Sequence, residues 1–256
     1  MSLVEQAQER FDVQVSVISA GLGLLGLEDM IPAYAATLIS NHDDSVLNTT
    51  DAQSLKPSVI RRRWWNTLVQ TEVLNRDRAR RLAYLDVSDP DTRVIICTGR
   101  NYIDAISLDL TWLMDGMQDR GRVMIFTSGK ALPSFKESWV TISGSMRQLL
   151  GGSMSTVSTR TAAAVLQRTP DLLDATMARE KTSDLLGETE EVPLEVRSRR
   201  RDEDIRDWIL DYLTDADSQS KSAALRAFRD DGNACEQARF GRIFVETQQL
   251  IESEIE

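Results

Sequence analysis

The feature that most constrains the fold is a series of short apolar runs, each closed by small residues. The runs are TRVIICTG ending at Gly99, GRVMIFTSG ending at Gly129 and WVTISGS ending at Ser145. They are rich in Val and Ile without strict alternation between apolar and polar residues, and a helical pattern over residues 102–117 separates the first two. This pattern predicts an α/β fold in which helices flank a mainly parallel sheet.

A fourth run of the same kind lies near the N-terminus. Residues 13–18 read as a short strand that follows a helix over residues 3–11 and leads into the glycine-rich turn SAGLGLLG. In parallel sheets ligands bind outside the carboxyl ends of the strands, where small residues let the backbone approach a ligand and offer N–H groups to an anion. The ends SAGLG, CTGRNY, TSGK and SGS therefore predict a binding site, although tight turns in any α/β fold explain the same glycines.

The composition excludes several classes of protein. Hydrophobic residues make up 41% of the chain and charged residues 27%, as in an ordinary globular protein. No run approaches the roughly 20 apolar residues of a membrane span, and the first residues lack the pattern of a signal peptide, so we expect a cytoplasmic protein without a membrane segment. One histidine and two distant cysteines argue against a zinc site, and TSGKALPS lacks the spacing of a Walker loop. We expect neither a metal nor a cofactor.

Charge is unevenly distributed along the chain. The formal net charge of −10 argues against a protein that simply coats nucleic acid. Within a predicted helix over residues 58–85, however, and just before it, basic residues outnumber the acidic Glu72 and Asp77. The members of this basic stripe are Lys56, Arg61, Arg62, Arg63, Arg76, Arg78, Arg80 and Arg81. Two interpretations stay open: a solvated helix face, or a surface that follows DNA phosphates through residues 61–63 and their neighbours.

An acidic segment divides the chain into two predicted domains. Residues 180–195 include GETEEVP, whose charge, glycine and proline are typical of a linker. The predicted organisation is an α/β domain over residues 1–178, a linker over residues 179–203 and a helical region over residues 204–256.

The helical region offers two interpretations. Its candidate helices cover residues 205–213, 221–229 and 234–252, with a DDGN turn before the last of them. A helix-turn-helix that grips DNA fits this pattern, and a plain helical bundle fits it equally well. The candidate DNA contacts of the first interpretation are Lys221, Arg226, Arg239 and Arg242.

The segment ISAGLGLLGLEDMIPAYAATL resembles the signature of a domain shared by the peroxide-stress YaaA family and by relatives associated with transglycosylase-like enzymes of 7-deazaguanine modification. In that signature a strand runs into Ser-Ala-x-x-Gly-Leu, then an acidic residue, Ile-x-x-Tyr and Thr-Leu. The matching residues are Ser19, Ala20, Gly23, Leu24, Asp29, Ile31, Tyr34, Thr37 and Leu38. Including RNYIDA at residues 100–105 and a segment over residues 144–161, the similarity covers roughly residues 5–170.

Some members of this wider group are similar in fold to uracil-DNA glycosylases and to base-excising anti-phage enzymes. The segment SAALRAFRDDGNACEQARFGRIF also resembles a helical tail of bacterial DNA-modification and anti-phage proteins. The resemblance implies a glycosylase-like α/β domain whose partner is DNA, including phage DNA with modified bases. The chain lacks the Gly-Gln-Asp-Pro-Tyr and His-Pro-Ser loops of the uracil enzymes. The resemblance therefore does not imply specificity for uracil.

A glycosylase that extrudes a base needs a carboxylate near the sugar, donors for the base and cations for the flanking phosphates. The candidate carboxylates are Glu28, Asp29 and Asp104, and the candidate phosphate contacts are Arg100 and Lys130. The candidate base contacts are Ser19, Gly21, Gly23, Tyr34, Gly99, Tyr102, Ser128 and Ser143. Plainer interpretations stay open for all of them: turn or helix-cap carboxylates, tight turns, and tyrosines packed at the edge of the core.

Three functions compete on the sequence alone. The first is a DNA glycosylase-like enzyme that excises a modified base and leaves an abasic site. The second is a DNA-binding protein of stress response or defence without catalysis, and the third is a scaffold whose acidic surface meets a protein partner. Salt-sensitive DNA binding separates the first two from the third, and formation of abasic sites separates the first from the second.

Overall fold

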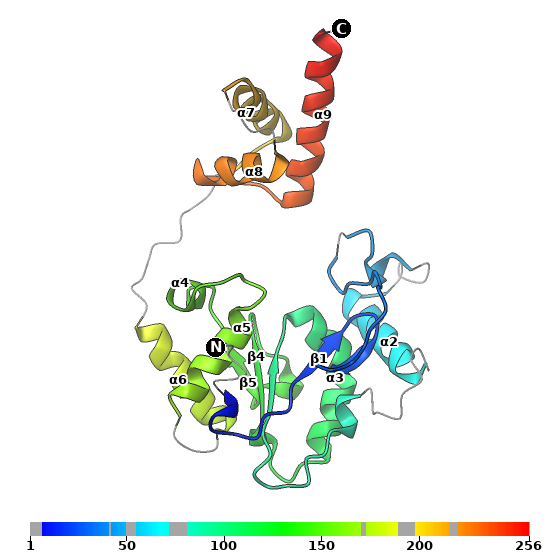
Figure 1. Cartoon of the computed structure of the whole chain (residues 1–256), viewed down its shortest axis with the longest axis vertical. Helices are drawn as coiled ribbons and strands as arrows, with labels where there is room; N and C mark the ends of the chain where they lie inside the picture. Colours follow the sequence, from blue (N-terminus) through cyan, green and yellow to red (C-terminus); the bar gives the residue numbers. More distant parts are fainter. Residues whose placement is uncertain are drawn as a thin grey trace. The chain divides into compact units, whose positions relative to one another are not determined.

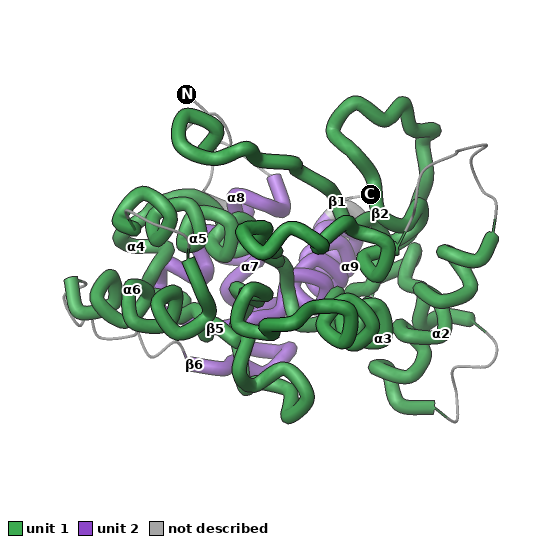
Figure 2. Tube along the Cα trace, turned by 90° about the horizontal axis from the view of Figure 1, so that it is seen from below, with its two compact units in different colours: residues 1–190 green, residues 191–256 purple. Residues whose placement is uncertain are grey.

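The computed structural model describes residues 7–40, 42–49, 55–71, 81–169, 173–188, 198–215 and 220–255. The chain divides into two compact units, residues 1–190 and 191–256, which Figure 2 draws in different colours. This division falls within the predicted linker. Residues 179–187, however, belong to helix α6, so the first unit extends beyond its predicted end. The helix forms there because Asp174 caps its first turn and Leu185 is buried in the core.

A three-stranded parallel sheet in the order β3-β4-β5 lies at the centre of the first unit (Figure 1). Its strands are β3 (Val94–Cys97), β4 (Val123–Thr127) and β5 (Trp139–Thr141). Every residue of the central strand β4 is buried, because helices cover both faces of the sheet. The prediction of an α/β fold with a parallel sheet is therefore confirmed, and the apolar runs are its strands.

The two faces of the sheet pack against different helices. Ile125 faces a core shared with α2 (Pro57–Gln70) and α3 (Arg100–Asp115), whereas its neighbours on β4 face the other core. That second core is completed by α4 (Met146–Leu150), α5 (Val157–Gln167) and α6 (Ala175–Gly187). Short 3-10 helices cover Val46–Asn48, Leu82–Tyr84, Arg120–Arg122 and Pro133–Phe135.

The glycine-rich turn near the N-terminus belongs to a hairpin, which corrects the prediction of a fourth strand in the parallel sheet. Strand β1 (Ser16–Ser19) pairs antiparallel with β2 (Gly23–Gly26), and the two form a separate sheet. Gly23 has a φ of 79°, a left-handed conformation that glycine adopts without strain. Two glycines in GLLG disfavour a helix after the turn, so these residues continue as a strand.

Helix α2 is shorter than the helix predicted over residues 58–85. It ends at Gln70, where Thr71 turns to an extended conformation and its backbone N–H bonds to the Leu68 carbonyl. Residues 72–80 lie outside the described residues. The helix predicted over residues 3–11 also lies partly outside them, and residues 7–8 are helical.

The second unit is helical. Its helices are α7 (Asp202–Asp215), α8 (Lys221–Asp230) and α9 (Gln237–Ile255), and β6 (Ser198–Arg199) pairs in parallel with β7 (Asn233–Ala234). The three predicted helices are confirmed, and Gly232, with a φ of 76°, lies in the predicted DDGN turn. Within the described parts of both units, every helix is too short or too polar to cross a membrane.

Candidate functional site

The start of α3 lies at the carboxyl edge of the parallel sheet, directly after β3. Gly99 occupies the N-cap position, and Arg100 is the first residue of the helix. The Nη1 atom of Arg100 donates to the backbone oxygen of Lys130, 2.9 Å away, in the loop that follows β4. This bond joins the segments CTGRNY and TSGK, which follow two adjacent strands of the sheet.

Asp104 lies between two guanidinium groups. Its Oδ1 atom accepts from Arg100 Nε at 3.0 Å, and its Oδ2 atom lies 3.7 Å from Arg61 Nη1. The Asp104 side chain is only 13% exposed, so these are partly desolvated contacts. Of the three carboxylates predicted for catalysis, Asp104 is the one that this cationic pair holds at the sheet edge.

Arg61 is buried, which corrects its predicted role as a phosphate contact. Its Nε atom donates to the backbone oxygen of Leu38 at 2.8 Å, and its Nη2 atom donates to Ser40 Oγ at 3.0 Å. Burial lowers the pKa of the guanidinium, and the charge of Asp104 opposes that shift. Arg61 therefore fastens residues 38–40 to α3, and it faces inward because it shares a helix face with the buried Trp65.

The hairpin brings two predicted base contacts to the same place. Ser19 Oγ donates to Tyr34 Oη at 2.8 Å, and Trp64 Nε1 donates to the Ala20 backbone oxygen at 2.7 Å. Burial, and then the neighbouring Tyr34 phenol, raise the pKa of Tyr102 above its ordinary value. We call this group of residues the α3 cluster; it consists of Ser19, Tyr34, Arg61, Arg100, Tyr102 and Asp104.

The remaining candidate carboxylates lie on the segment after β2. Asp29 accepts from the Gly26 backbone N–H through Oδ2 at 2.7 Å, which stabilises the turn that ends the hairpin. Glu28, beside it, is exposed. Because β1 is not part of the parallel sheet, neither residue follows a carboxyl end of that sheet.

Two of the other predicted base contacts, Ser128 and Ser143, follow different strands of the parallel sheet. Ser128 follows β4 and is exposed, and Ser143 follows β5 and accepts from the Ser145 backbone N–H at 3.3 Å. Gly21 lies in the hairpin turn against the ring of Tyr34. Lys130 contributes its backbone oxygen to the α3 cluster, while its side chain is exposed.

Sequence reasoning missed a buried ion pair on the other side of α3. Asp109 is 0% exposed and accepts from Arg81 through Oδ1, at 2.7 Å from Nη2 and 3.0 Å from Nε. Its Oδ2 atom accepts from Trp65 Nε1 at 3.1 Å, and the Arg81 guanidinium lies 4.4 Å from the ring centroid of Trp112. The available signal was an aspartate on the apolar face of the predicted helix.

The basic stripe is therefore not one surface. Arg81 and Arg61 face inward, where each meets a carboxylate of α3, whereas Arg62 and Arg63 are exposed on α2. Lys56 is exposed at the N-cap of the same helix. Residues 76, 78 and 80 lie outside the described residues. The exposed part of the stripe stays a candidate for phosphate contact.

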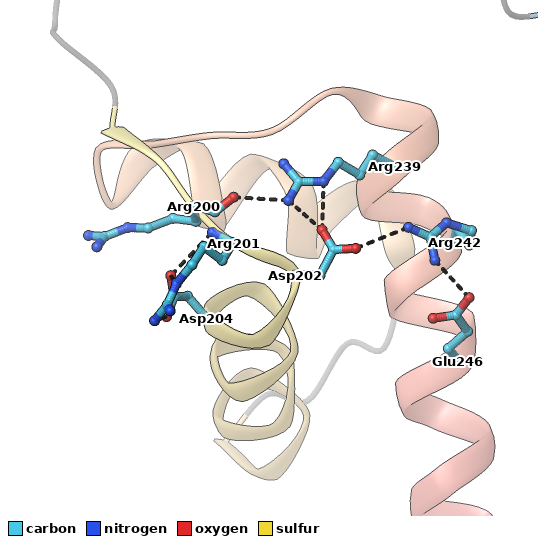
Figure 3. Close-up of polar contacts among 7 residues, drawn as sticks. All are labelled: Arg200, Arg201, Asp202, Asp204, Arg239, Arg242 and Glu246. Carbon is cyan, nitrogen blue, oxygen red and sulfur yellow. Dashed lines mark hydrogen bonds and ion pairs between the residues drawn. The ribbon is translucent and has the colours of Figure 1, made fainter.

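Two predicted DNA contacts of the second unit converge on Asp202 at the start of α7 (Figure 3). Arg239 bonds to Asp202 through Nε at 2.7 Å and also through Nη2, and Arg242 Nη2 lies 3.2 Å from the other carboxylate oxygen. Arg242 also pairs with Glu246 at 3.0 Å. These contacts hold α9 against α7 and partly neutralise both arginines, whereas Lys221 and Arg226 are exposed on α8.

We expect Asp202 to contribute to the pH dependence of the second unit. A hydrogen bond from Arg239, supported by one from Arg242, lowers the pKa of the Asp202 carboxyl below its ordinary value. Such a group stabilises the fold above its unfolded pKa, and that contribution is lost as the pH falls through the lower folded pKa. We therefore expect acidification below about pH 4 to destabilise this unit, and less steeply in Asp202→Asn.

Thermal melts followed by the NMR signal of the Trp208 indole N–H measure this effect, because that group donates to Asp231 at 2.8 Å within the second unit. Asp207→Asn, an exposed change on the same helix, is the matched control and should keep the wild-type pH dependence. Equal pH dependence in Asp202→Asn and the wild type would contradict the prediction.

The two cysteines are free thiols, and both are half-buried. Burial raises the pKa of Cys97 to about 12, so this thiol stays protonated at physiological pH. Across the described residues, no three His, Cys, Asp or Glu side chains are grouped so that they hold a metal ion.

Comparison of the chain with known proteins adds no relative to this picture. No family model, no curated protein and no solved structure matches the chain.

Proposed function

We propose that this protein is a DNA glycosylase-like enzyme that extrudes a modified base from DNA and hydrolyses its N-glycosidic bond, in phage defence or DNA modification. The observation that supports the proposal is the α3 cluster. A carboxylate, an exposed guanidinium and two tyrosines gather there at the carboxyl edge of a parallel sheet, the usual ligand edge of such folds.

In this proposal Asp104 is the catalytic carboxylate. Water attacks C1′ of the sugar and passes a proton to Asp104, while the base leaves with the electron pair of the C1′–N bond. The released base takes up a proton from solvent, and Asp104 returns its proton to solvent. The negative carboxylate also stabilises the oxocarbenium-like sugar of the transition state. In the proposal Arg100, whose side chain is 40% exposed, contacts a flanking phosphate, and the exposed residues 62 and 63 of α2 are further candidates for phosphate contact.

A second candidate is a DNA-binding protein without catalysis. The observation that favours it is the pair of guanidiniums on Asp104, because a carboxylate that only holds Arg61 and Arg100 in place needs no chemistry. Both candidates predict DNA binding that weakens steeply with salt. Only the first predicts abasic sites.

The deciding experiment incubates the purified chain with a panel of DNAs, including phage genomes with hypermodified cytosine or guanine, and measures alkali-labile abasic sites. We expect Asp104→Asn to lower their formation by about 100-fold or more, because proton transfer at the attacking water is lost. Thermal denaturation checks that the variant is folded.

Asp115→Asn is the matched control, because Asp115 lies at the far end of the same helix in an exposed pair with Arg120. It should cleave like the wild type. Abasic sites that form equally well in Asp104→Asn would remove this residue from the mechanism. Salt-sensitive binding with intact bases on every DNA would favour the second candidate.

A further inference from the structure

The proton positions in the α3 cluster follow from its hydrogen bonds. Ser19 Oγ accepts from the backbone N–H of Gly21 at 3.3 Å and of Leu22 at 3.1 Å, and it lies 2.8 Å from Tyr34 Oη. A hydroxyl carries one proton and two lone pairs. Because two backbone donors occupy the lone pairs of Ser19, its proton is directed at Tyr34.

The hydroxyl of Tyr34 is therefore an acceptor toward Ser19, and its own proton must point elsewhere. The Tyr34 side chain is exposed, and among the described residues no acceptor is within hydrogen-bond distance of that proton. The Ser19 hydrogen bond orients this phenolic O–H, and no acceptor among the described residues takes its proton. Such a group is suited to donate to a ligand.

The ring that carries this hydroxyl is fixed in place by Gly21. A Cβ atom at Gly21 would lie 2.4 Å from Cδ2 and 2.8 Å from Cε2 of the Tyr34 ring, closer than real Cβ contacts. Only glycine at this position of the hairpin turn therefore leaves room for the Tyr34 ring. A donor held in this way loses little freedom on binding, which favours a defined direction of approach.

We propose that Tyr34 is a specificity-determining donor that selects bases with a carbonyl oxygen over bases with an amino group at the same position. This inference deepens the proposed function, on which it rests for the identity of the ligand as an extruded base. Arg100, the exposed cation of the cluster, likewise offers only donors, so an amino group meets no complementary acceptor there except Asp104. If an amino group faced the Tyr34 hydroxyl, the N–H of the base and the O–H of Tyr34 would both be left without an acceptor.

The test measures binding and does not depend on excision. Single-stranded pentanucleotides carry one central base between abasic nucleotides, and titration calorimetry compares hypoxanthine with adenine and uracil with cytosine. In each pair an oxo group is exchanged for an amino group at one position. We expect the wild type to bind the oxo member about tenfold more tightly, the scale of one net hydrogen bond.

Three variants and one control identify the source of this preference. Tyr34→Phe should bring the two members of each pair within about twofold, because only the hydroxyl is lost. Ser19→Ala leaves the hydroxyl but not its orientation, and Gly21→Ala displaces the ring, so both should reduce the preference. Tyr84→Phe, at a tyrosine that is 64% exposed elsewhere in the first unit, should leave it unchanged.

A preference that survives in Tyr34→Phe would overturn the proposal, as would equal affinity for both members or no binding in the wild type. A Tyr34-dependent preference without abasic sites on any DNA would sustain this inference while removing the glycosylase activity. Abasic sites formed without a Tyr34-dependent preference would support the glycosylase activity and overturn this inference.

Discussion

Replacing Asp109 by Asn is expected to lower the free energy of unfolding of the first unit by about 3–5 kcal/mol, the cost of removing one partner from a buried ion pair. The carboxylate is fully buried, and Arg81 reaches it with two nitrogens while being only 9% exposed itself. With Asn in its place, the guanidinium stays buried with its charge uncompensated. The bond from Trp65 is weakened at the same time.

Urea unfolding followed by tryptophan fluorescence measures the loss, because four of the five tryptophans, at residues 64, 65, 112 and 139, lie in the first unit. Asp115→Asn, in an exposed pair on the same helix, should not shift the midpoint measurably. Exchanging both partners, with Asp109→Leu and Arg81→Met, should recover most of the stability because no buried charge remains. A loss below about 1 kcal/mol in Asp109→Asn, as for exposed pairs, would contradict this account.

The second large effect is expected from Phe228→Ala, which should unfold the second unit while the first stays folded. Phe228 is 1% exposed, with ring centroids 5.1 Å from Trp208 and 5.3 Å from Phe240. Truncating a buried phenylalanine costs about 3–5 kcal/mol. A unit as small as residues 191–256 has a core that supplies no more than about this amount.

Hydrogen exchange of the full chain, resolved by peptide, distinguishes the two units in one experiment. Peptides from α7, α8 and α9 should lose protection in Phe228→Ala, while β4 keeps its own. Leu250→Ala, at a position of α9 that is 52% exposed, should exchange like the wild type. Protection of the three helices that persists in Phe228→Ala would show that the aromatic core is not what holds them together.

The sequence predicted those parts of the fold whose signal is local. Runs such as VIIC and VMIFT are apolar throughout because helices cover both faces of the sheet, and the glycines at Gly151 and Gly232 mark real breaks between helices. The hairpin was not predicted. A strand that ends in a glycine turn leads equally well into a helix or into a second strand, and only the tertiary contacts of residues 23–26 decide between them.

The candidate site was likewise predictable only in part. Ser19, Tyr34, Tyr102 and Asp104 were each identified from a motif. The structure bonds Ser19 to Tyr34 and pairs Asp104 with Arg61 and Arg100. The ion pairs of Arg61 and Arg81 were not predictable, because they depend on carboxylates of α3; Asp109 is 28 residues from Arg81 in the sequence. A single helix with mixed basic and apolar residues gives no sign of such a partner.

Helix α2 links the hairpin to helix α3 in the first unit. Its adjacent residues Trp64 and Trp65 point about 100° apart, one bonded to the Ala20 carbonyl of the hairpin and the other to buried Asp109. A shift of the hairpin that keeps the Trp64 bond must therefore turn α2 as well, and that rotation strains the Asp109 contact. Opening of the α3 cluster should thus be a concerted motion on the microsecond to millisecond timescale of packed helices, slower than the fluctuation of a free loop.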